Sequence, residues 1–375
     1  MGTSPRLLLV GAGHAHLEVL RRLGARDHPP VELTVVSDTS HQLYSGMVPG
    51  FLYGEYREEE VAVDLTPLVT RAKGKLVAAR ASGVDPGARR VRLEGGGEVG
   101  YDLVSVNVGS RTAGEGTPGV REHAAVIKPI ERALEVRRRL WELAGSEGRR
   151  REVAVVGAGA AGVEVACAAR TVLDRAGGGG VRLLEAGGEI LPGYSERVRS
   201  TARRVLAARG VEVRIGAPVA AVRAGGVGLE GGEDLPADLV VWLTGAAAPP
   251  LFAGSGLTLD GQGFLLVDPA LRSLSHPEVF GAGDCVTPAA HPETPKAGVY
   301  AVRAAPVLWR SLLAALGARG QYPSYAPQRS FLSILNTADG RALLRWRGIV
   351  SHSRWAWRLK DRIDRRFIAR YQGQP

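Results

Sequence analysis

The sequence predicts an α/β fold built from two similar βαβ units and followed by a helical C-terminal segment. Two glycine-rich turns support this prediction. They begin at Gly11 and Gly157, and each follows a short apolar run and precedes a stretch with helical apolar periodicity. In both copies a second apolar run leads to an acidic residue, Asp38 or Glu185, which lies 27 or 28 residues after the first glycine. The chain therefore contains an internal duplication.

Length and composition fit a globular protein of two domains. The 375 residues are 45% hydrophobic and 23% charged, which excludes a disordered chain. Cys167 and Cys285 are far apart and belong to no CxxC pair, so no local redox dithiol is expected. His14 and His16 have no third ligand at metal spacing, so no metal site is expected. The uncharged stretch 239–259 contains two prolines and several glycines, which argues against a membrane-spanning helix.

The second glycine turn predicts a dinucleotide-binding unit of the Rossmann type. Its pattern is Gly157-x-Gly159-x-x-Gly162. The three glycines permit a tight turn, a close approach of the backbone to a pyrophosphate, and close packing of helix on strand. The amide dipoles of the following helix face the phosphate. At the next strand end, Glu185 can accept hydrogen bonds from both ribose hydroxyls and would repel a 2′-phosphate, which favours NAD over NADP.

The first glycine turn departs from this pattern. Gly11 and Gly13 occupy the first two positions, but His16 stands where the third glycine is expected. The acidic residue that would bind a ribose falls on Ser37 or on Asp38, and the sequence leaves both open. The histidines of this turn are interpreted as packing or cofactor contacts.

Shorter elements are expected between and after the two turns. Residues 76–79 and 90–93 are predicted to be strands of a glycine-rich meander, and 238–243 is predicted to be a further apolar strand. Helical periodicity returns over 298–316.

The C-terminal segment predicts a basic amphipathic helix. Apolar or aromatic residues recur every four positions on one face. Residues 351–375 hold seven basic and two acidic residues, so they carry half of the formal net charge of +10. Two interpretations stay open. In the first interpretation, residues 351–371 lie in a membrane interface. In the second, the stripe of apolar residues on this helix packs on the protein itself. This local charge argues for an anionic surface as partner rather than nucleic acid. The stripe consists of Trp355, Leu359, Ile363, Phe367 and Tyr371, with Ile368 beside it.

Several further motifs carry a family resemblance. The segment 279–285, with sequence VFGAGDC, is similar to the second FAD motif of the two-dinucleotide-binding flavoproteins, the superfamily of pyridine nucleotide-disulfide oxidoreductases and type II NADH dehydrogenases. Segments 101–110 and 238–245 resemble the two crossover motifs of that superfamily. A narrower resemblance is to the NADH dehydrogenase-like domain that is found fused to selenide water dikinases, and it rests on segments 13–16, 44–50, 128–130, 295–303 and 359–367.

The resemblance implies two Rossmann-like domains, the NAD domain inserted into the FAD domain. It implies an FAD-binding domain over 1–112 and 240–320, an NAD(P)-binding domain over 113–239, and a C-terminal region over 321–375. The implied FAD contacts are Gly11, Gly13, His14, Ala15, Ser37, Asp38, Pro49, Gly109, Gly283, Asp284, Lys296, Ala297 and Gly298. The implied NAD contacts are Gly157, Gly159, Ala160, Gly162, Glu185 and Gly245, and Glu164 matches a glutamate near the nicotinamide.

The function expected from this resemblance is that of an FAD-dependent NAD(P)H dehydrogenase. Hydride passes from NADH to the flavin, and two electrons then pass to a quinone-type acceptor without a redox disulfide, since no flavin-side cysteine pair is present. NADPH is the less favoured donor. The alternative is a flavoprotein that acts as reductase or redox-sensing partner for a protein, such as a ferredoxin or a component of selenium metabolism. A cytoplasmic location is expected, with peripheral attachment to the inner face of the membrane and a homodimer left open.

Overall fold

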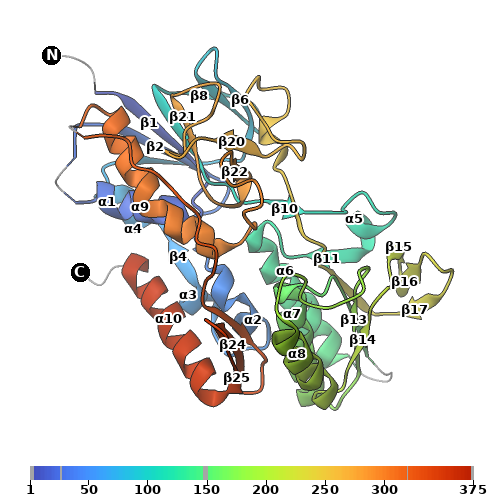
Figure 1. The fold of residues 1–375 in the computed structure, drawn as a ribbon. Helices are drawn as coiled ribbons and strands as arrows, with labels where there is room; N and C mark the ends of the chain where they lie inside the picture. The colour runs from blue at the N-terminus through green and yellow to red at the C-terminus, as the bar shows by residue number, and fades with distance from the viewer. Residues whose placement is uncertain (1–3, 26–27, 147–150, 319, 373–375) are drawn as a thin grey trace.

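Two parallel five-stranded sheets form the framework of the molecule. The computed structural model describes residues 4–25, 28–146, 151–318 and 320–372 (Figure 1). The first sheet has the order β21-β9-β1-β2-β5, and all its strand pairs are parallel. Its strands are β1 (Arg6–Val10), β2 (Glu32–Ser37), β5 (Lys75–Ala78), β9 (Leu103–Val106) and β21 (Val279–Gly281).

The second sheet repeats this plan and confirms the expected duplication. It has the order β11-β18-β12-β13-β14, again with parallel pairs throughout. Helices α6 (Ala133–Gly145), α7 (Ala160–Arg175) and α8 (Glu196–Ala208) accompany it, as α1 (His14–Leu23), α4 (Leu65–Arg71) and α9 (Gly298–Ala315) accompany the first. The strands are β11 (Ala124–Val126), β12 (Glu152–Val156), β13 (Gly180–Leu184), β14 (Val211–Arg214) and β18 (Leu239–Trp242).

The position of β18 corrects the expected domain boundary. Strand β18 pairs with β11 and β12 in the second sheet, so residues 240–242 do not belong to the first unit. The chain crosses between the units at two adjacent segments, where β10 (Arg111–Thr112) pairs with β19 (Ala246–Ala247).

The strand expected at 76–79 is also placed differently, because β5 is an edge strand of the main sheet rather than part of a meander.

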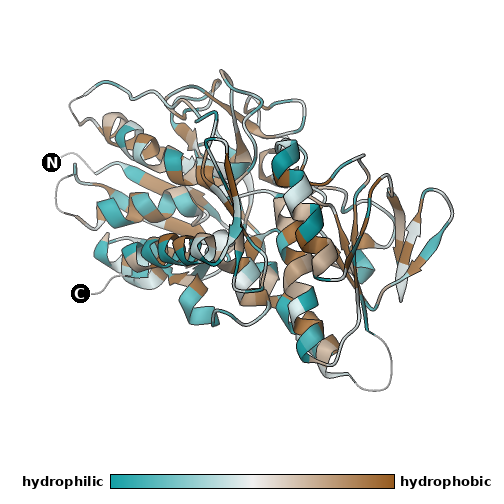
Figure 2. Cartoon of the chain, turned by 60° about the horizontal axis from the view of Figure 1, so that its bottom comes forward, coloured by the Kyte–Doolittle hydropathy of each residue, from teal (hydrophilic) through white to brown (hydrophobic). Residues whose placement is uncertain are grey.

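Apolar strands fill the interior of both units. Strand β1 contributes Leu7, Leu8, Leu9 and Val10, each no more than 1% exposed. This burial on both faces is the reason for its uninterrupted apolar run. Figure 2 shows hydrophobic strands inside the molecule and hydrophilic positions on the outward faces of the helices.

Small antiparallel sheets and short helices complete the fold. Sheet β6-β7-β8 follows β5 along the chain, and sheet β15-β16-β17 follows β14. The bounds are β3 (His41–Leu43), η1 (Ser45–Met47), α2 (Val48–Leu52), α3 (Glu58–Val61), β4 (Ala62–Asp64), β6 (Ala81–Asp85), β7 (Arg90–Leu93), β8 (Glu98–Gly100), α5 (Val120–His123), η2 (Ile130–Arg132), β15 (Val219–Arg223), β16 (Gly226–Leu229), β17 (Asp234–Pro236), η3 (Pro250–Phe252), β20 (Leu265–Val267), η4 (Gly283–Cys285) and β22 (Val286–Pro288).

The C-terminal region consists of a three-stranded sheet and one long helix. Strands β23 (Ser333–Asn336), β24 (Ala342–Trp346) and β25 (Ile349–Ser353) precede α10 (Arg354–Gln372), which packs against β4, β23 and β24. No helix within the described residues is long and apolar enough to cross a membrane.

The expected single apolar face of α10 is divided between two sides of the helix. Ile368 and Tyr371 are buried, and Phe367 packs on the core. Trp355 and Ile363 point to solvent and are 52% and 41% exposed. The buried side of the helix also carries Asp364, which accepts a hydrogen bond from Lys360. The stripe is therefore partly a packing face and partly an exposed surface.

We predict that Gly162→Ala destabilises the protein by about 2 kcal/mol or more. A Cβ atom at Gly162 would lie 1.8 Å from the Gly157 carbonyl oxygen, so backbone must move to admit it. Gly159→Ala is the matched control, because a Cβ there meets nothing within 4 Å. Urea unfolding should place the control within about 0.5 kcal/mol of the wild type. Equal stability of the two variants would contradict this account of the turn.

Candidate functional site

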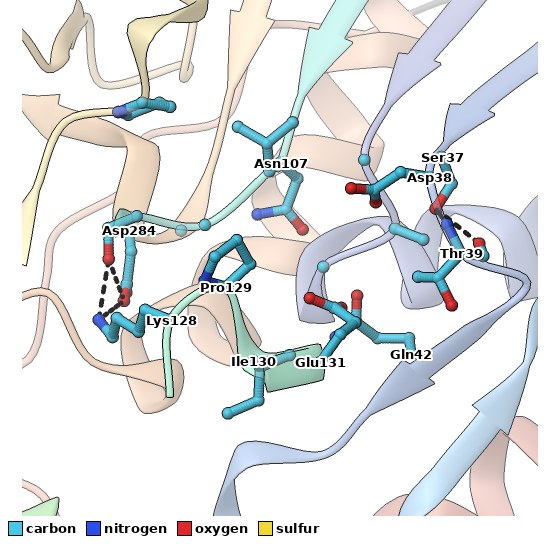
Figure 3. Close-up of a pocket in the computed structure, with 18 of the residues that line it drawn as sticks. Ser37, Asp38, Thr39, Gln42, Asn107, Lys128, Pro129, Ile130, Glu131 and Asp284 are labelled. Carbon is cyan, nitrogen blue, oxygen red and sulfur yellow. Dashed lines mark hydrogen bonds and ion pairs between the residues drawn. The ribbon is translucent and has the colours of Figure 1, made fainter. Parts of the chain in front are cut away.

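A cavity of about 250 Å³ opens at the carboxyl ends of β1, β2 and β9. This is where ligands bind in open parallel sheets. Many of the residues that line it were assigned to FAD by the sequence analysis. Its lining includes Gly11, Gly13, His14, Ser37, Asp38, Thr39, Gln42, Ser45, Arg80, Asn107, Gly109, Ser110, Lys128, Pro129, Ile130, Glu131, Gly283, Asp284 and Gly298 (Figure 3).

The glycine turn packs against Asn107, a residue that the sequence analysis missed. A Cβ at Gly11 would lie 2.7 Å from the Asn107 carbonyl oxygen, and one at Gly13 would lie 2.6 Å from its Oδ1. Asn107 Oδ1 accepts hydrogen bonds from the amides of Ala15 and His16 at 3.0 and 3.2 Å. Its Nδ2 donates to the Ala282 carbonyl at 2.6 Å. The backbone amide of Ala15 is therefore bound to Asn107, and Ala15 does not line the cavity.

His16 acts as a packing residue. Its ring is fully buried, with Nδ1 2.6 Å from the Gly11 carbonyl and Nε2 2.8 Å from Ser105 Oγ. Burial lowers the pKa of His16 to about 4, so the ring is neutral. His16 stands at the third position of the first turn, where it bonds to the Gly11 carbonyl. The second turn has Gly162 at this position, and its backbone packs closely against Gly157.

His14 faces the cavity and has an unsatisfied ring nitrogen. Its Nε2 is buried and has no hydrogen-bond partner among the described residues. Burial lowers its pKa to about 4, and the nearby charge of Asp284 opposes this shift. The rings of Tyr44 and Phe367 lie 5.4 and 5.5 Å away. A buried polar atom without a partner at a cavity wall indicates a ligand that would supply the missing hydrogen bond.

Asp284 lies at the other end of the cavity and is paired with Lys128. Lys128 Nζ is 2.8 Å from Asp284 Oδ2 and donates to Ser110 Oγ at 2.8 Å (Figure 3). The sequence analysis listed Lys296 among the FAD contacts, but this residue does not line the cavity. Lys296 Nζ donates to the Val286 carbonyl and to a neighbouring threonine hydroxyl, and it lies over the Phe264 ring.

Two further residues expected as FAD contacts lie outside the cavity. Pro49 is buried in α2, and Ala297 precedes α9 as its N-cap. Neither belongs to the cavity lining, whereas Gly298, the first residue of α9, does. Gly283 lines the cavity and has φ +77°, and a Cβ there would lie 2.5 Å from Asn107 Nδ2.

The carboxyl end of β2 contains both candidates for an acidic ribose ligand. Ser37 Oγ donates to the Thr39 carbonyl at 2.8 Å. The Asp38 carboxylate accepts two hydrogen bonds from Arg80, at 2.8 and 2.6 Å. Glu131 also lines this end. It directly follows segment 128–130, which carries part of the family resemblance, but the sequence analysis assigned it no contact.

The second glycine turn is held by Glu185. Glu185 Oε2 accepts from the Ala158 amide at 2.8 Å, and Oε1 accepts from the Gly187 amide at 2.8 Å. The turn begins at Gly157, whose φ is +101°. Gly159 and Gly245 lie where a Cβ would meet nothing within 4 Å, so space beside the turn is open. Ala160 is the first residue of α7.

Glu164 lies where α7, the C-terminal sheet and α10 meet. Its Oε1 accepts from the Asn336 amide at 2.7 Å. Burial raises the pKa of Glu164 to about 7, although the charge of Lys360 opposes this shift. Lys360 Nζ donates to Asp364 at 2.8 Å and to the Gly46 carbonyl at 2.7 Å. Gly46 follows Ser45, which lines the cavity, whereas Glu164, Lys360 and Asp364 do not belong to its lining.

The two cysteines are inert by burial. Burial raises the pKa of Cys167 to about 12 and that of Cys285 to about 11, so both are thiols near neutral pH. Both are free, and no group of metal-ligating side chains occurs within the described part of the chain.

Comparison with known proteins identifies relatives of similar architecture. The model of the pyridine nucleotide-disulphide oxidoreductase family matches residues 5–305. Demethylphylloquinone reductase NdbB of Synechocystis is 27% identical over 291 residues, which cover 75% of this chain and 71% of the relative. Type II NADH:quinone oxidoreductase NdhA of Mycobacterium tuberculosis is 28% identical, over 76% of this chain and 67% of the relative. The sulfide:quinone oxidoreductase of Aquifex aeolicus has the same fold, with a TM-score of 0.82, 18% identity and coverage of 98% and 91%.

We predict that Lys128→Met weakens flavin binding roughly tenfold, whereas Lys296→Met changes it less than about twofold. Removal of Lys128 leaves the Asp284 carboxylate uncompensated at the cavity wall, where it would repel a pyrophosphate. Lys296 does not line this cavity, and its Nζ is bound to the Val286 carbonyl and the Thr287 hydroxyl. Titration of the apoprotein with FAD by fluorescence measures both affinities, and thermal unfolding checks that the variants are folded. A larger loss in Lys296→Met would contradict the assignment.

Proposed function

The chain belongs to the pyridine nucleotide-disulphide oxidoreductase family, and on that premise we propose that it is an FAD-dependent NADH dehydrogenase that reduces a quinone-type acceptor. One observation carries the proposal. Two glycine turns open at the ends of two parallel sheets, and both cysteines are buried thiols. Electrons must then leave the flavin directly, without a disulfide. The relatives named above include an NADH:quinone oxidoreductase and a demethylphylloquinone reductase.

The cavity of the first unit fits FAD. The orphaned His14 Nε2, the glycines pressed against Asn107, and the Lys128–Asp284 pair line one continuous pocket. When bound, the flavin accepts a hydride from NADH and passes two electrons to the acceptor. Helix α9 begins at Gly298, which lines the pocket, so the positive end of its dipole would stabilise negative charge on a reduced flavin.

The second unit is the proposed site for NADH. The turn from Gly157 to Gly162 would receive the pyrophosphate in the open space beside Gly159. Each oxygen of the Glu185 carboxylate holds one amide and has lone pairs left for ribose hydroxyls. The same charge would repel the 2′-phosphate of NADPH, and this is the basis for proposing NADH as the preferred donor.

The exposed side of α10 is the proposed contact with a membrane. Arg354, Arg358, Arg362 and Arg366 recur every four residues, and the structure gives these exposed side chains no ion pair within its described residues. Trp355 and Ile363 lie beside this stripe and are 52% and 41% exposed. Rings that enter the interface and arginines that meet anionic lipid fit the cytoplasmic face of a bilayer.

Two finer points stay predictions of the sequence. One is the relation to domains fused to selenide water dikinases, and the other is the formation of a homodimer. A protein acceptor, such as a ferredoxin, is the alternative to quinone, because the same arginine stripe could attract an acidic protein surface.

The purified flavoprotein should oxidise NADH with soluble quinones and should turn over faster with a lipophilic quinone when anionic liposomes are added. Spectrophotometry of NADH with a quinone panel, with and without liposomes, measures both effects. Gly159→Val is the control, because a side chain in the open space beside the turn should abolish NADH turnover and leave the flavin bound. Reduction by NADH without turnover on any quinone would contradict the proposal and favour a protein acceptor.

Glu185→Arg should reverse or remove the preference for NADH over NADPH. The substitution exchanges a carboxylate, which would repel the 2′-phosphate, for a guanidinium cation, which would attract it. We expect kcat/KM for NADH to fall roughly tenfold or more and that for NADPH to rise. Steady-state rates with both donors give the ratio. An unchanged ratio would show that Glu185 does not contact the ribose.

Glu164→Gln should remove a pH dependence near neutrality, if Glu164 supplies a proton to the reduced acceptor. With a pKa of about 7, Glu164 is largely protonated at pH 6 and largely ionised at pH 8. Wild-type quinone reduction should therefore decline as pH rises through about 7, and the variant should be flat there.

The stability of Glu164→Gln provides a separate check on the same pKa. Because the folded pKa is raised above the ordinary value of 4.5, the wild type loses stability relative to the variant as pH rises from about 4.5 to 7. Urea unfolding of both proteins across this range measures the difference. A constant difference would contradict the raised pKa.

A further inference from the structure

A carboxylate from outside the first βαβ unit enters its cavity. Glu131 lies in the short helix η2 (Ile130–Arg132), on the segment between β11 and α6 of the second unit. Helix η2 nevertheless packs against β3 of the first unit, and Glu131 lines the cavity there. Figure 3 shows it near Thr39 and Gln42, at the end of the cavity formed by the carboxyl end of β2.

The polar side chains around Glu131 already have protein partners. Asp38 is bound by Arg80 through two hydrogen bonds of 2.8 and 2.6 Å, and Ser37 Oγ donates to the Thr39 carbonyl at 2.8 Å. Gln42 Nε2 donates to the Leu43 carbonyl at 3.0 Å. The charge of Asp38 is therefore offset by Arg80, which binds its Oδ2, and the Ser37 hydroxyl carries no charge.

Glu131 differs because the described residues supply its carboxylate with no side-chain partner. Its one hydrogen bond is to its own backbone amide. Burial raises the pKa of Glu131, and the Asp38 charge adds to this while Arg80 opposes it. A partly buried carboxylate that faces a cavity is costly unless donors reach it. Two hydroxyl groups on a ligand are donors of the required kind.

We propose that Glu131 binds the ribose hydroxyls of the adenosine half of FAD. The inference rests on the proposed function, since it assumes that the cavity holds FAD. In a Rossmann unit the ribose lies at the carboxyl end of the second strand, and this is the end that Glu131 enters. Lys128, three residues earlier, lies at the opposite end with Asp284 (Figure 3). One short segment therefore contacts both ends of the cavity.

The test compares FAD with its 2′-deoxyadenosine analogue, because the two differ only at the proposed contact. Quenching of flavin fluorescence on titration of the apoprotein reports the flavin site alone. Wild type should bind FAD about tenfold or more tightly than the analogue, since hydrogen bonds to a charged acceptor are strong. Glu131→Gln should bind FAD about tenfold more weakly than wild type and should bind the two flavins with similar affinity.

Two other carboxylates provide matched comparisons. Glu115 also lines the cavity, but it is paired with Arg111 at 2.8 Å, so Glu115→Gln should keep the preference for FAD. Asp38→Asn tests the competing assignment at the end of β2. Loss of the preference in Asp38→Asn, and its retention in Glu131→Gln, would overturn the proposal. Thermal unfolding of each apoprotein establishes that it is folded.

The pH dependence of affinity adds a second readout. FAD affinity of the wild type should fall on acidification as Glu131 becomes protonated, and that of Glu131→Gln should stay flat over the same range. An equal change of FAD affinity with pH in both proteins would overturn the proposal. A wild-type apoprotein that binds no flavin at all would instead overturn the proposed function, so the two failures are distinguishable.

Discussion

The packing of backbone against Asn107 is the constraint on which the cavity depends. Gly11 and Gly13 lie in the turn after β1 and Gly283 lies in η4, and a Cβ on any of them would lie within 2.7 Å of this residue. The Asn107 side chain is 2% exposed and is satisfied by two amides of α1 and one carbonyl before η4. This buried amide forms hydrogen bonds through both its oxygen and its nitrogen, and it fixes these segments relative to one another, because a lost bond would leave a polar group unpaired.

The C-terminal region adds a second constraint, which links the two units. Helix α10 is bound to the first unit by Lys360, which donates to the Gly46 carbonyl, and by Tyr56, whose hydroxyl donates to Asp361 at 2.8 Å. Strand β23 reaches the second unit through the hydrogen bond between Asn336 and Glu164. Burial lowers the pKa of Lys360, but the carboxylates of Asp364 and Glu164 outweigh this effect and raise it, so the lysine stays charged. Each unit is thus held to the same C-terminal element.

The duplicated fold could be predicted from the sequence because its signals are local: apolar runs, glycine turns and acidic strand ends recur at fixed spacing. The direction of a side chain depends on tertiary contacts instead. Lys296 was expected at the flavin but turns to the Val286 carbonyl, and Lys128 takes the place beside Asp284. The predicted domain boundary between residues 239 and 240 is wrong for a similar reason. Strand pairing decides to which sheet β18 belongs, and the sequence does not specify that pairing. Glu131 directly follows the motif at 128–130, but only the tertiary contact of η2 with β3 brings it to the cavity.

In α10, the position of each basic residue is more informative than the net charge of the helix. Of its seven basic residues, Lys360 is paired with Asp364, Arg365 with Asp361 and Glu60, and Arg370 with Glu18. These contacts hold the helix on the protein. The other four arginines recur every four residues on the exposed side, and the apolar residues near them are those that the core does not cover. The two interpretations of this segment therefore do not compete, because one side of the helix packs on the fold and the other is left as a basic, partly aromatic surface.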